Sequence, residues 1–292
     1  MTISVIIPAY KAALTIKRAL ASVATQTLKP EQVIVVDDGS DDDTFKIAEA
    51  FKDQLYGIEL KIFSQKNLGA GAARNRAINE ATGDWLAFLD ADDEWLPKKL
   101  AISMEAICKH NLVLIAHNYF NVNEVRKKIV FCNTRYDAAA SPYRGLYRKG
   151  FLATSSVVVR RDAVLDAGGF DETLKTAQDF DLWLKILKKE NATFRVEPDV
   201  LLNYFVTPGS ITSQTTRRLD CTLRIAIKHA PSMIDLYIRI FNIHYEAINS
   251  ALAKGQVIQA LYFFIKLPFH LSCMAHEYTR TKKSVKITDY FF

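Results

Sequence analysis

Runs of apolar residues that stop abruptly at acidic residues constrain the fold of this chain more than any other feature. One run covers residues 85–89 and another residues 32–36, which is followed directly by Asp37 and Asp38. The carboxylates after the first run are Asp90, Asp92, Asp93 and Glu94. Strands that are apolar throughout, and not alternately apolar and polar, are typical of a parallel sheet that helices cover on both faces.

Helical patterns separate these runs in the first half of the chain. We expect strands at residues 3–7, 32–36, 60–64 and 85–89, and helices at residues 13–26, 44–51, 70–81 and 97–110. This alternation predicts an α/β fold with a mostly parallel sheet flanked by helices. In such sheets ligands bind at the carboxyl ends of the strands, and both acidic clusters are expected there.

The pattern is less regular after residue 110. We expect strands near residues 113–120, 128–132 and 155–160, a helix at 161–167, an amphipathic helix from residue 178 and a closing loop at 203–212. No internal repeat interrupts this order.

The crowded carboxylates have two interpretations. Four carboxylates at a strand end repel one another unless a cation neutralises them, and Mg²⁺ or Mn²⁺ bound to oxygen ligands is the usual neutraliser. The alternative is a solvated acidic loop that caps the next helix. Simple alternatives exist elsewhere too, because Asp37 could form an ordinary Asx turn and Asp179 could cap a helix.

Charge is divided unevenly along the chain. Residues 1–216 contain 27 basic and 27 acidic residues, whereas residues 217–292 contain 11 basic and 5 acidic residues. The whole net charge of +6 therefore lies in the last quarter, which localises any attraction to an anionic surface there.

Cysteine spacing and hydrophobicity favour a cytoplasmic protein. The four cysteines show no paired spacing, so we expect reduced thiols and neither a zinc site nor a disulfide framework. The first expected strand begins at residue 3, which leaves no room for a signal peptide. The longest apolar stretch, residues 257–275, contains Lys266, Pro268 and His270, so a membrane span is not expected.

Five motifs in a fixed order resemble family 2 inverting glycosyltransferases of the bacterial cell-surface polysaccharide type, which have the GT-A fold. They lie at residues 4–10, 35–44, 67–75, 89–93 and 168–183, and the resemblance extends to about residue 213. It implies a Rossmann-like, mostly parallel sheet with helices. It also implies a catalytic domain at residues 1–216, in which 1–110 form the nucleotide-sugar half and 111–216 the acceptor half. Residues 217–292 are then a helical, basic extension.

The resemblance implies a binding site for a nucleotide-diphospho-sugar, with a UDP-sugar as the expected donor. Residues Pro8, Ala9 and Tyr10 would pack against the base, and Asp38, next to Asp37, would accept a hydrogen bond from the base imide. The remaining residues implied around the nucleotide are Asn67, Arg74, Asn75, Asp90, Ala91 and Asp92. Arg74 is as well explained by a structural ion pair.

The resemblance also implies the chemistry. Asp90 and Asp92 match the Asp-X-Asp motif, in which Asp90 would contact the ribose or the metal and Asp92 would bind Mg²⁺ or Mn²⁺ on the donor diphosphate. Asp179 matches the general base that deprotonates the acceptor hydroxyl. Two departures stand out. Gln178 replaces a common glutamate, and Phe205 and Thr207 stand where basic or metal-binding side chains are common, with Arg217 or Arg218 as candidate replacements.

The last quarter of the chain has no counterpart in this family pattern. We expect one or two helices at residues 219–253, followed by an apolar, aromatic stretch at 256–276 and a basic tail. This combination predicts attachment to an anionic membrane surface, on the inner face of the cell membrane, with a saccharide or lipid-linked saccharide as acceptor. The alternative is a helical hairpin packed on the catalytic domain.

Two rival functions remain at this stage. One is a non-catalytic nucleotide-sugar-binding or docking module of the same fold, which the departures at Gln178, Phe205 and Thr207 would favour. The other is a sugar nucleotidyltransferase, but residues 8–13 lack the glycine-rich basic loop expected after its first strand. Nucleic-acid binding is not expected, because the positive charge is interleaved with apolar helix.

Overall fold

The computed structural model describes residues 1–123, 126–136, 141–149, 152–206 and 215–288. The chain divides into two compact units. The first comprises Met1–Pro142, Phe151–Leu174 and Gln178–Thr207, and the second comprises Tyr143–Gly150, Lys175–Ala177 and Pro208–Phe292. All the predicted site residues belong to the first unit.

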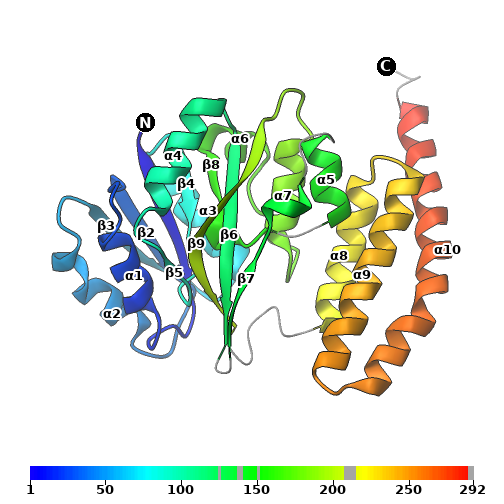
Figure 1. Cartoon of the computed structure of the whole chain (residues 1–292), viewed down its shortest axis with the longest axis horizontal. Coiled ribbons are helices and arrows are strands. Elements are labelled where there is room, and N and C mark those ends of the chain that lie inside the picture. Colours follow the sequence, from blue (N-terminus) through cyan, green and yellow to red (C-terminus); the bar gives the residue numbers. More distant parts are fainter. Residues whose placement is uncertain (124–125, 137–140, 150–151, 207–214, 289–292) are drawn as a thin grey trace. The chain divides into compact units, whose positions relative to one another are not determined.

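Four parallel strands form one half of the sheet in the first unit (Figure 1). They are β1 (Ile3–Ala9), β2 (Gln32–Asp37), β3 (Glu59–Ser64) and β4 (Trp85–Phe88). Ala9 pairs with Asp37 and Asp37 with Ser64, so the carboxyl ends of β1, β2 and β3 meet at one edge. The predicted parallel arrangement is confirmed here, and β1, β2 and β4 are buried along their whole length.

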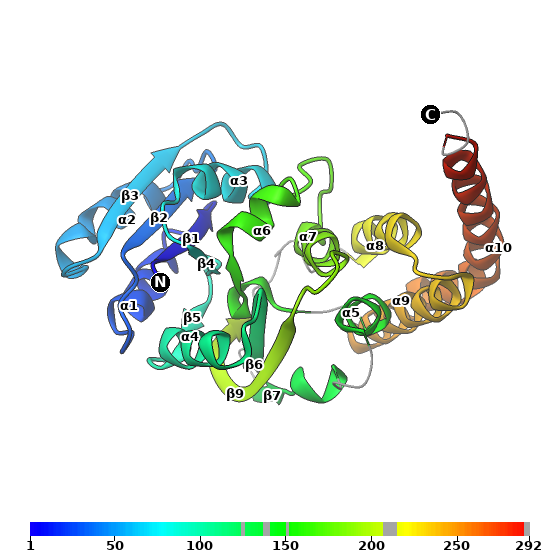
Figure 2. The same cartoon turned by 90° about the horizontal axis from the view of Figure 1, so that it is seen from above.

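Helices cover both faces of the sheet. Helix α3 (Ala70–Glu80) lies on the same face as α6 (Arg161–Asp166), whereas α1 (Ile16–Ala24) and α4 (Lys99–His110) lie on the opposite face (Figure 2). The short helix α2 (Thr44–Ala50) packs against α1, and a 3-10 turn, η1 (Lys52–Gln54), follows it. Each helix begins within three residues of its predicted start.

The other half of the sheet is mixed. Its strands are β5 (Glu94–Trp95), β6 (Leu114–Val122), β7 (Lys127–Val130), β8 (Val158–Arg160) and β9 (Phe194–Phe205), and the sheet order is β3-β2-β1-β4-β8-β6-β9-β5, with β7 on β6. Strand β8 runs antiparallel to both β4 and β6, while β6 and β9 are parallel. The 3-10 turns η2 (Asn133–Arg135) and η3 (Thr154–Ser156) belong to this half.

One expected loop is wrong over part of its length. Residues Asn203–Phe205, which were predicted to begin the closing loop, form the end of β9 and pair with β6. Their strand conformation depends on pairing with residues some eighty positions earlier, which local sequence patterns do not show. The rest of that loop, residues 207–212, lies outside the described residues.

Three aromatic rings tie α7 (Gln178–Leu187) to the sheet within the first unit. Phe88 of β4 contacts Phe170 and Trp183, with ring centroids 5.6 Å away in both cases, and each contact is edge-on. All three side chains are buried. Because edge-on aromatic packing is directional, this cluster fixes how α7 and the loop containing Phe170 approach β4.

Helices make up the second unit. They are α5 (Pro142–Lys149), α8 (Thr215–His229), α9 (Met233–Ala253) and α10 (Val257–Thr288). Ser232 caps α9 by accepting a hydrogen bond from the amide of Asp235 at 3.1 Å, which explains why residues 219–253 form two helices. The buried Asp235 carboxylate also accepts from Arg144 and Arg148, so α5 belongs with the C-terminal helices.

Helix α10 exposes most of its apolar surface. Within the described part of the chain, the segment Val257–Arg280 is the one stretch long and apolar enough to cross a membrane, and only 11% of its most apolar window is buried. Length and composition are weak evidence, because core helices of soluble proteins can meet the same criteria. Lys266, Pro268 and His270 interrupt this segment, and they are the reason why a membrane span is not expected. That expectation stays a prediction.

Lys99, a buried lysine of α4, affects the pKa of His117, a buried histidine of β6, in the first unit. The Lys99 ammonium lies 4.0 Å from the ring centroid of Trp95, and burial lowers the pKa of Lys99 well below its ordinary value. Burial, with repulsion from Lys99, also lowers the pKa of His117 to about 3. His117 is therefore neutral in the folded protein near pH 7.

This burial predicts a specific loss of stability in mild acid. In the unfolded chain His117 has its ordinary pKa of 6.5, so it is protonated below that pH. In the folded chain its pKa of about 3 keeps it neutral until the pH approaches 3. The unfolding free energy therefore falls as the pH falls through this window. The His117→Gln variant should lose about 1.5–2 kcal/mol less unfolding free energy than the natural protein between pH 6.5 and 5. Urea unfolding at both pH values measures this. The variant His110→Gln, at an exposed position, is the control, and equal pH dependence in all three proteins would contradict the prediction.

Candidate functional site

The predicted base-binding residues lie where β1 ends. Pro8 and Ala9 are buried within β1, whereas Tyr10 is 49% exposed. The carbonyl of Ala9 accepts a hydrogen bond from the amide of Asp38 at 2.8 Å, which joins the ends of β1 and β2. Tyr10 is thus the member of this trio whose side chain offers a surface to a ligand.

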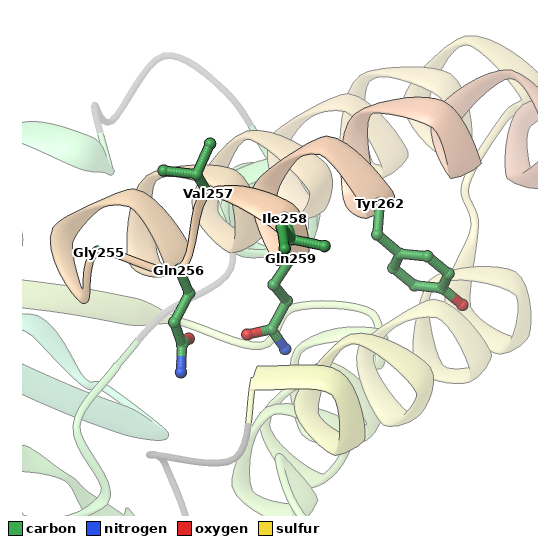
Figure 3. Close-up of a pocket in the computed structure, with 6 residues that line it drawn as sticks. All are labelled: Gly255, Gln256, Val257, Ile258, Gln259 and Tyr262. Atoms are coloured by element: carbon green, nitrogen blue, oxygen red, sulfur yellow. The ribbon is translucent and has the colours of Figure 1, made fainter.

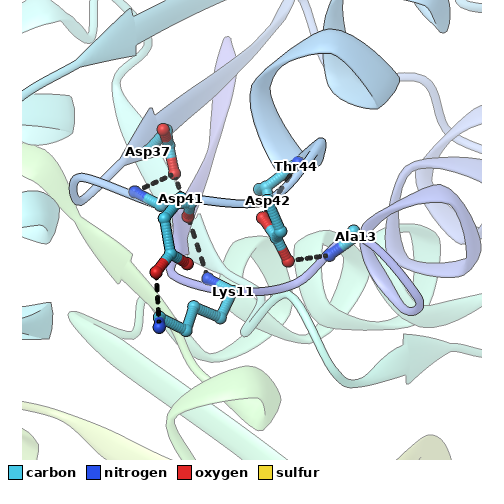
Figure 4. A network of polar contacts seen from close by, with 7 residues as sticks. Lys11, Ala13, Asp37, Asp41, Asp42 and Thr44 are labelled. Atoms are coloured by element: carbon cyan, nitrogen blue, oxygen red, sulfur yellow. Dashed lines mark hydrogen bonds and ion pairs between the residues drawn. The ribbon is translucent and has the colours of Figure 1, made fainter.

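Polar contacts fasten the loops after β1 and β2 to each other (Figure 4). The Lys11 ammonium forms an ion pair with Asp41 at 2.9 Å. Asp41 raises the pKa of Lys11, and Lys11 lowers the pKa of Asp41. Asp42 accepts from the amides of Ala13 and Thr44. Although burial opposes them, the hydrogen bonds from Thr44 and Ala13 hold the pKa of Asp42 below its ordinary value.

Asp37 holds its own turn, and Asp38 holds a neighbouring loop. Asp37 accepts from the hydroxyl of Ser40, which is the local turn considered as its simple interpretation. Asp38 accepts from the amides of Leu68 and Gly69, at 2.9 and 2.8 Å, and from the side chain of Gln65. Both oxygens of Asp38 are therefore already used, and its contact with a base imide stays a prediction.

Gly39 allows two of these loops to approach closely. Its φ of +77° is in the left-handed region, and a Cβ atom added there would lie 2.9 Å from the amide nitrogen of Asn67. Asn67 itself is exposed beside this turn. A larger residue at position 39 would push the 65–69 loop away from the end of β2.

Arg74 and Asn75 each make structural contacts from α3. The buried Arg74 guanidinium forms an ion pair with Asp90 at 2.6 Å, and its role at a nucleotide stays a prediction. The Asn75 side chain donates to the carbonyl of Phe170 and accepts from its amide, at 2.9 and 2.8 Å. Asn75 thus braces the loop at residues 168–172, and its role at a nucleotide stays a prediction.

The acidic motif is held from several sides. Ala91 is buried, Asp90 pairs with Arg74, and the main-chain carbonyl of Asp92 accepts from Arg18, whose guanidinium lies 3.7 Å from the ring centroid of Phe205. Asp93 is buried and accepts from the Ser155 hydroxyl and from the amide of Phe205 at 3.0 Å. Burial, with repulsion from Asp90 and Asp92, raises the pKa of Asp93 well above its ordinary value.

The donor atoms of this motif suit a hard divalent cation. Asp90 and Asp92 are close enough to Asp93 to raise its pKa, so their negative charges are concentrated in one place. Carboxylate oxygens are ligands that Mg²⁺ and Mn²⁺ prefer. No group of three or more acidic, histidine or cysteine side chains within the described residues is arranged around one point, so two carboxylates would need further oxygens from a bound diphosphate.

Asp179 lies in the first turn of α7 and is partly exposed. Its carboxylate accepts from the Thr154 hydroxyl at 2.9 Å and from the amide of Phe180 at 2.8 Å. The side-chain amide of Gln178 donates to the carbonyl of Leu174 at 2.7 Å. A glutamate at position 178 would place a carboxylate against that carbonyl, which explains why glutamine fits this site.

Three contributors to the site were not predicted: Arg18, Thr154 and Ser155. Residues 155–160 were expected to form a strand, whereas Thr154–Ser156 form the turn η3. Three consecutive hydroxyl residues before an apolar strand were the available signal, because buried hydroxyls need hydrogen-bond partners. Their partners, Asp179 and Asp93, lie far away in the sequence.

The pocket drawn in Figure 3 lies elsewhere. It is an open hollow at the start of α10, lined by Gly255, Gln256, Val257, Ile258, Gln259 and Tyr262. It contains none of the predicted site residues.

A mixed sheet with carboxylates at the carboxyl ends of its parallel strands is the GT-A arrangement of glycosyltransferases. Residues 4–166 match the family model described as glycosyl transferase family 2, and the chain belongs to this family. The predicted family and fold are therefore confirmed, and the chain is a glycosyltransferase.

The comparisons identify similar proteins of this class. The chain is 31% identical over 220 residues to the UDP-Glc:alpha-D-GlcNAc-diphosphoundecaprenol beta-1,3-glucosyltransferase WfgD of Escherichia coli, covering 74% of this chain and 82% of that protein. S. aureus TarS 1-349 in complex with UDP-GlcNAc superposes with a TM-score of 0.69 at 21% identity, covering 99% of this chain and 92% of that one. The mannosyltransferase PcManGT from Pyrobaculum calidifontis, in complex with GDP-Man and Mn²⁺, gives 0.66 at 18%, covering 98% and 80%. These two structural matches show the fold alone.

The Arg74–Asp90 pair should stabilise the acidic motif. Replacing Arg74 by Met leaves Asp90 without its counter-charge next to two other carboxylates, and we expect the unfolding free energy to fall by about 3 kcal/mol. Adding Asp90→Asn should recover part of that loss. The exposed pair of Arg160 and Asp162 is the control, and Arg160→Met should cost less than about 1 kcal/mol. Similar losses at the two sites in denaturant unfolding would contradict this interpretation.

Proposed function

We propose that this glycosyltransferase transfers a sugar, with inversion, from a UDP-sugar to a hydroxyl group of a lipid-linked saccharide in cell-surface polysaccharide synthesis. The similarity to a UDP-glucose enzyme that acts on a diphosphoundecaprenol-linked sugar supports the donor and acceptor classes. The observation that carries the mechanism is that Asp179 and the acidic motif both form hydrogen bonds with hydroxyl groups of one turn, η3.

The donor would bind at the carboxyl edge of β1, β2 and β4. Tyr10 is available to pack on the base, and the loops braced by Asp37 and Asp38 would surround the nucleoside. Asp90 and Asp92 would hold Mg²⁺ or Mn²⁺ on the diphosphate. When bound, the cation neutralises the charge that develops on the leaving nucleoside diphosphate.

Asp179 is the proposed general base. Its partly exposed carboxylate is oriented by Thr154 and by the amide of Phe180. It would take the proton of the acceptor hydroxyl as the oxygen forms its bond to the anomeric carbon. The bond from that carbon to the diphosphate breaks on the opposite side, which inverts the configuration.

We assign residues 1–110 to donor binding, 111–216 to acceptor binding, and 217–292 to the helical extension. The contacts of Asp235 with Arg144 and Arg148 support adding α5 to the extension. Arg218 lies within α8, whereas Thr207 and the side chain of Arg217 lie outside the described part of the structure.

The proposed chemistry can be tested with a panel of nucleotide sugars, Mn²⁺ and a lipid-linked acceptor. Asp179→Asn keeps the size of the side chain but cannot accept a proton, so kcat should fall by about 10²–10⁴ with the KM for the donor nearly unchanged. Asp92→Ala should abolish turnover and metal-dependent donor binding while the protein stays folded. The control is Asp162→Asn, at an exposed surface pair. A loss below tenfold for Asp179→Asn would mean that Asp179 only caps α7.

Helix α10 is the proposed attachment to an anionic membrane surface. Ile258, Phe264 and Ile265 are 86%, 64% and 71% exposed on it, and the chain continues into a basic tail. Apolar side chains inserted into a bilayer and nearby basic residues contribute separately, since only the second contribution is screened by salt. This supports a cytoplasmic enzyme bound peripherally at the inner face of the membrane.

Two full-length variants separate the contributions. Changing Arg280, Lys282, Lys283 and Lys286 to Gln should weaken binding to phosphatidylglycerol vesicles at low salt by at least about tenfold, at about 1 kcal/mol per charge. Changing Ile258 and Ile265 to Ser should weaken binding at both low and high salt. Leu14→Ser, at a position that is 98% exposed in the first unit, is the control. If the natural protein does not sediment with such vesicles at low salt, membrane attachment is wrong.

A further inference from the structure

The turn η3 places three consecutive hydroxyl side chains in the interior of the first unit. Thr154, Ser155 and Ser156 are 6%, 0% and 1% exposed. Hydroxyl groups removed from water cost free energy unless they form hydrogen bonds, so their partners indicate why they are there. Two of the three reach carboxylates from distant parts of the chain, and the third makes a local contact.

Thr154 reaches the proposed base. Its hydroxyl donates to Oδ2 of Asp179 at 2.9 Å, and the amide of Phe180 donates to Oδ1 of the same carboxylate at 2.8 Å. One donor on each oxygen fixes the plane of the carboxylate. Without the Thr154 hydroxyl, the carboxylate would keep the hydrogen bond from the amide of Phe180 on one oxygen and could rotate about its last bond.

Ser155 reaches the acidic motif. Its hydroxyl accepts from the amide of Asp90 at 3.0 Å and donates to Oδ2 of the buried Asp93. Its carbonyl accepts from the indole nitrogen of Trp95 at 2.7 Å. Ser155 thus contacts Asp90, Asp93 and Trp95, which lie before and after Asp92 in the same segment.

The turn itself is firmly held. The amide of Ser156 donates to the carbonyl of Ala153 at 2.8 Å, and that of Val157 donates to the carbonyl of Thr154 at 3.0 Å. The amide of Phe88 in β4 donates to the carbonyl of Val157 at 3.2 Å. Because consecutive Cα atoms lie about 3.8 Å apart, groups held by Thr154 and Ser155 keep a nearly constant separation.

We infer that η3 sets the distance between the metal-binding motif and the catalytic base, with Thr154 as a positioning residue for Asp179 and Ser155 as a positioning residue for Asp90 and Asp92. This inference rests on the proposed function. It divides the roles of two adjacent residues: Thr154 acts on the chemical step, and Ser155 acts on metal and donor binding. A turn that only fills space would show no such division.

Thr154→Val keeps the shape of the side chain and removes its donor. It should lower kcat by about 10- to 100-fold while the KM for the donor and the affinity for Mn²⁺ change less than about twofold. Thr154→Ser, which restores the hydroxyl, should return kcat to within about threefold of the natural enzyme. Unfolding midpoints are measured in parallel.

Ser155→Ala removes the contact to both Asp90 and Asp93. Titration of Mn²⁺ in the presence of UDP, followed by calorimetry, should show an affinity about 10- to 100-fold weaker, and this readout does not depend on turnover. If Ser155→Ala does not fold, Ser155→Cys keeps the shape with a weaker donor and provides the same test.

Ser156→Ala is the matched control, because its hydroxyl contacts only the carbonyl of Ala153, at 2.7 Å, among the contacts seen for it. Ser156→Ala should leave both kcat and the affinity for Mn²⁺ within about twofold of the values for the natural enzyme. Equal effects of Ser156→Ala and the other two variants would overturn the inference, as would Thr154→Val acting on Mn²⁺ affinity and not on kcat.

The inference and the proposed function fail in different ways. If Asp179→Asn retains activity, the proposed base is wrong. If Asp179→Asn is inactive but Thr154→Val turns over normally, Asp179 keeps its role and only the positioning by η3 is wrong.

Discussion

The crowding of carboxylates at one edge of the sheet is the constraint on which the rest of this site depends. The parallel register of β1, β2 and β4 brings the acidic loops that follow β2 and β4 to the same edge as the end of β1. Burial, with repulsion from Asp90 and Asp92, raises the pKa of Asp93, so carboxylates crowded in such a place need compensating partners. Arg74, backbone amides and buried hydroxyls provide these partners.

The partners come from segments that are distant in the sequence, so the acidic edge also organises the fold. Asp38 holds the 65–69 loop, Asp93 holds the end of β9 and η3, and Asp179 is held by η3 in turn. Hydrogen bonds to charged groups are stronger than those between neutral groups. The residues that bind a substrate in our proposal are therefore also those that connect the loops, and changes there would affect folding and activity together.

The second unit follows a different principle. Its interior is tied together by the buried carboxylate of Asp235 between α5 and α9 and by a histidine pair, His244 and His270, whose nitrogens lie 2.9 Å apart. Its outer helix leaves large apolar residues exposed. The first unit concentrates negative charge at its site, whereas the basic excess of the chain lies in the second, which separates the proposed chemistry from the proposed attachment.

The sequence by itself determined the family, the parallel strands β1 to β4 and the identity of the acidic residues, because these depend on local apolar runs and on motifs within a few residues. It did not determine the end of β9, the antiparallel position of β8 or the partners of Asp38, Asn75 and Asp93. Those depend on pairings across 27 to 112 positions of the chain. Thr154 and Ser155 show the difference most clearly, since a hydroxyl in a sequence has no direction. Only the tertiary structure, which buries both groups and so requires each to find a partner, shows that one faces Asp179 and the other Asp93.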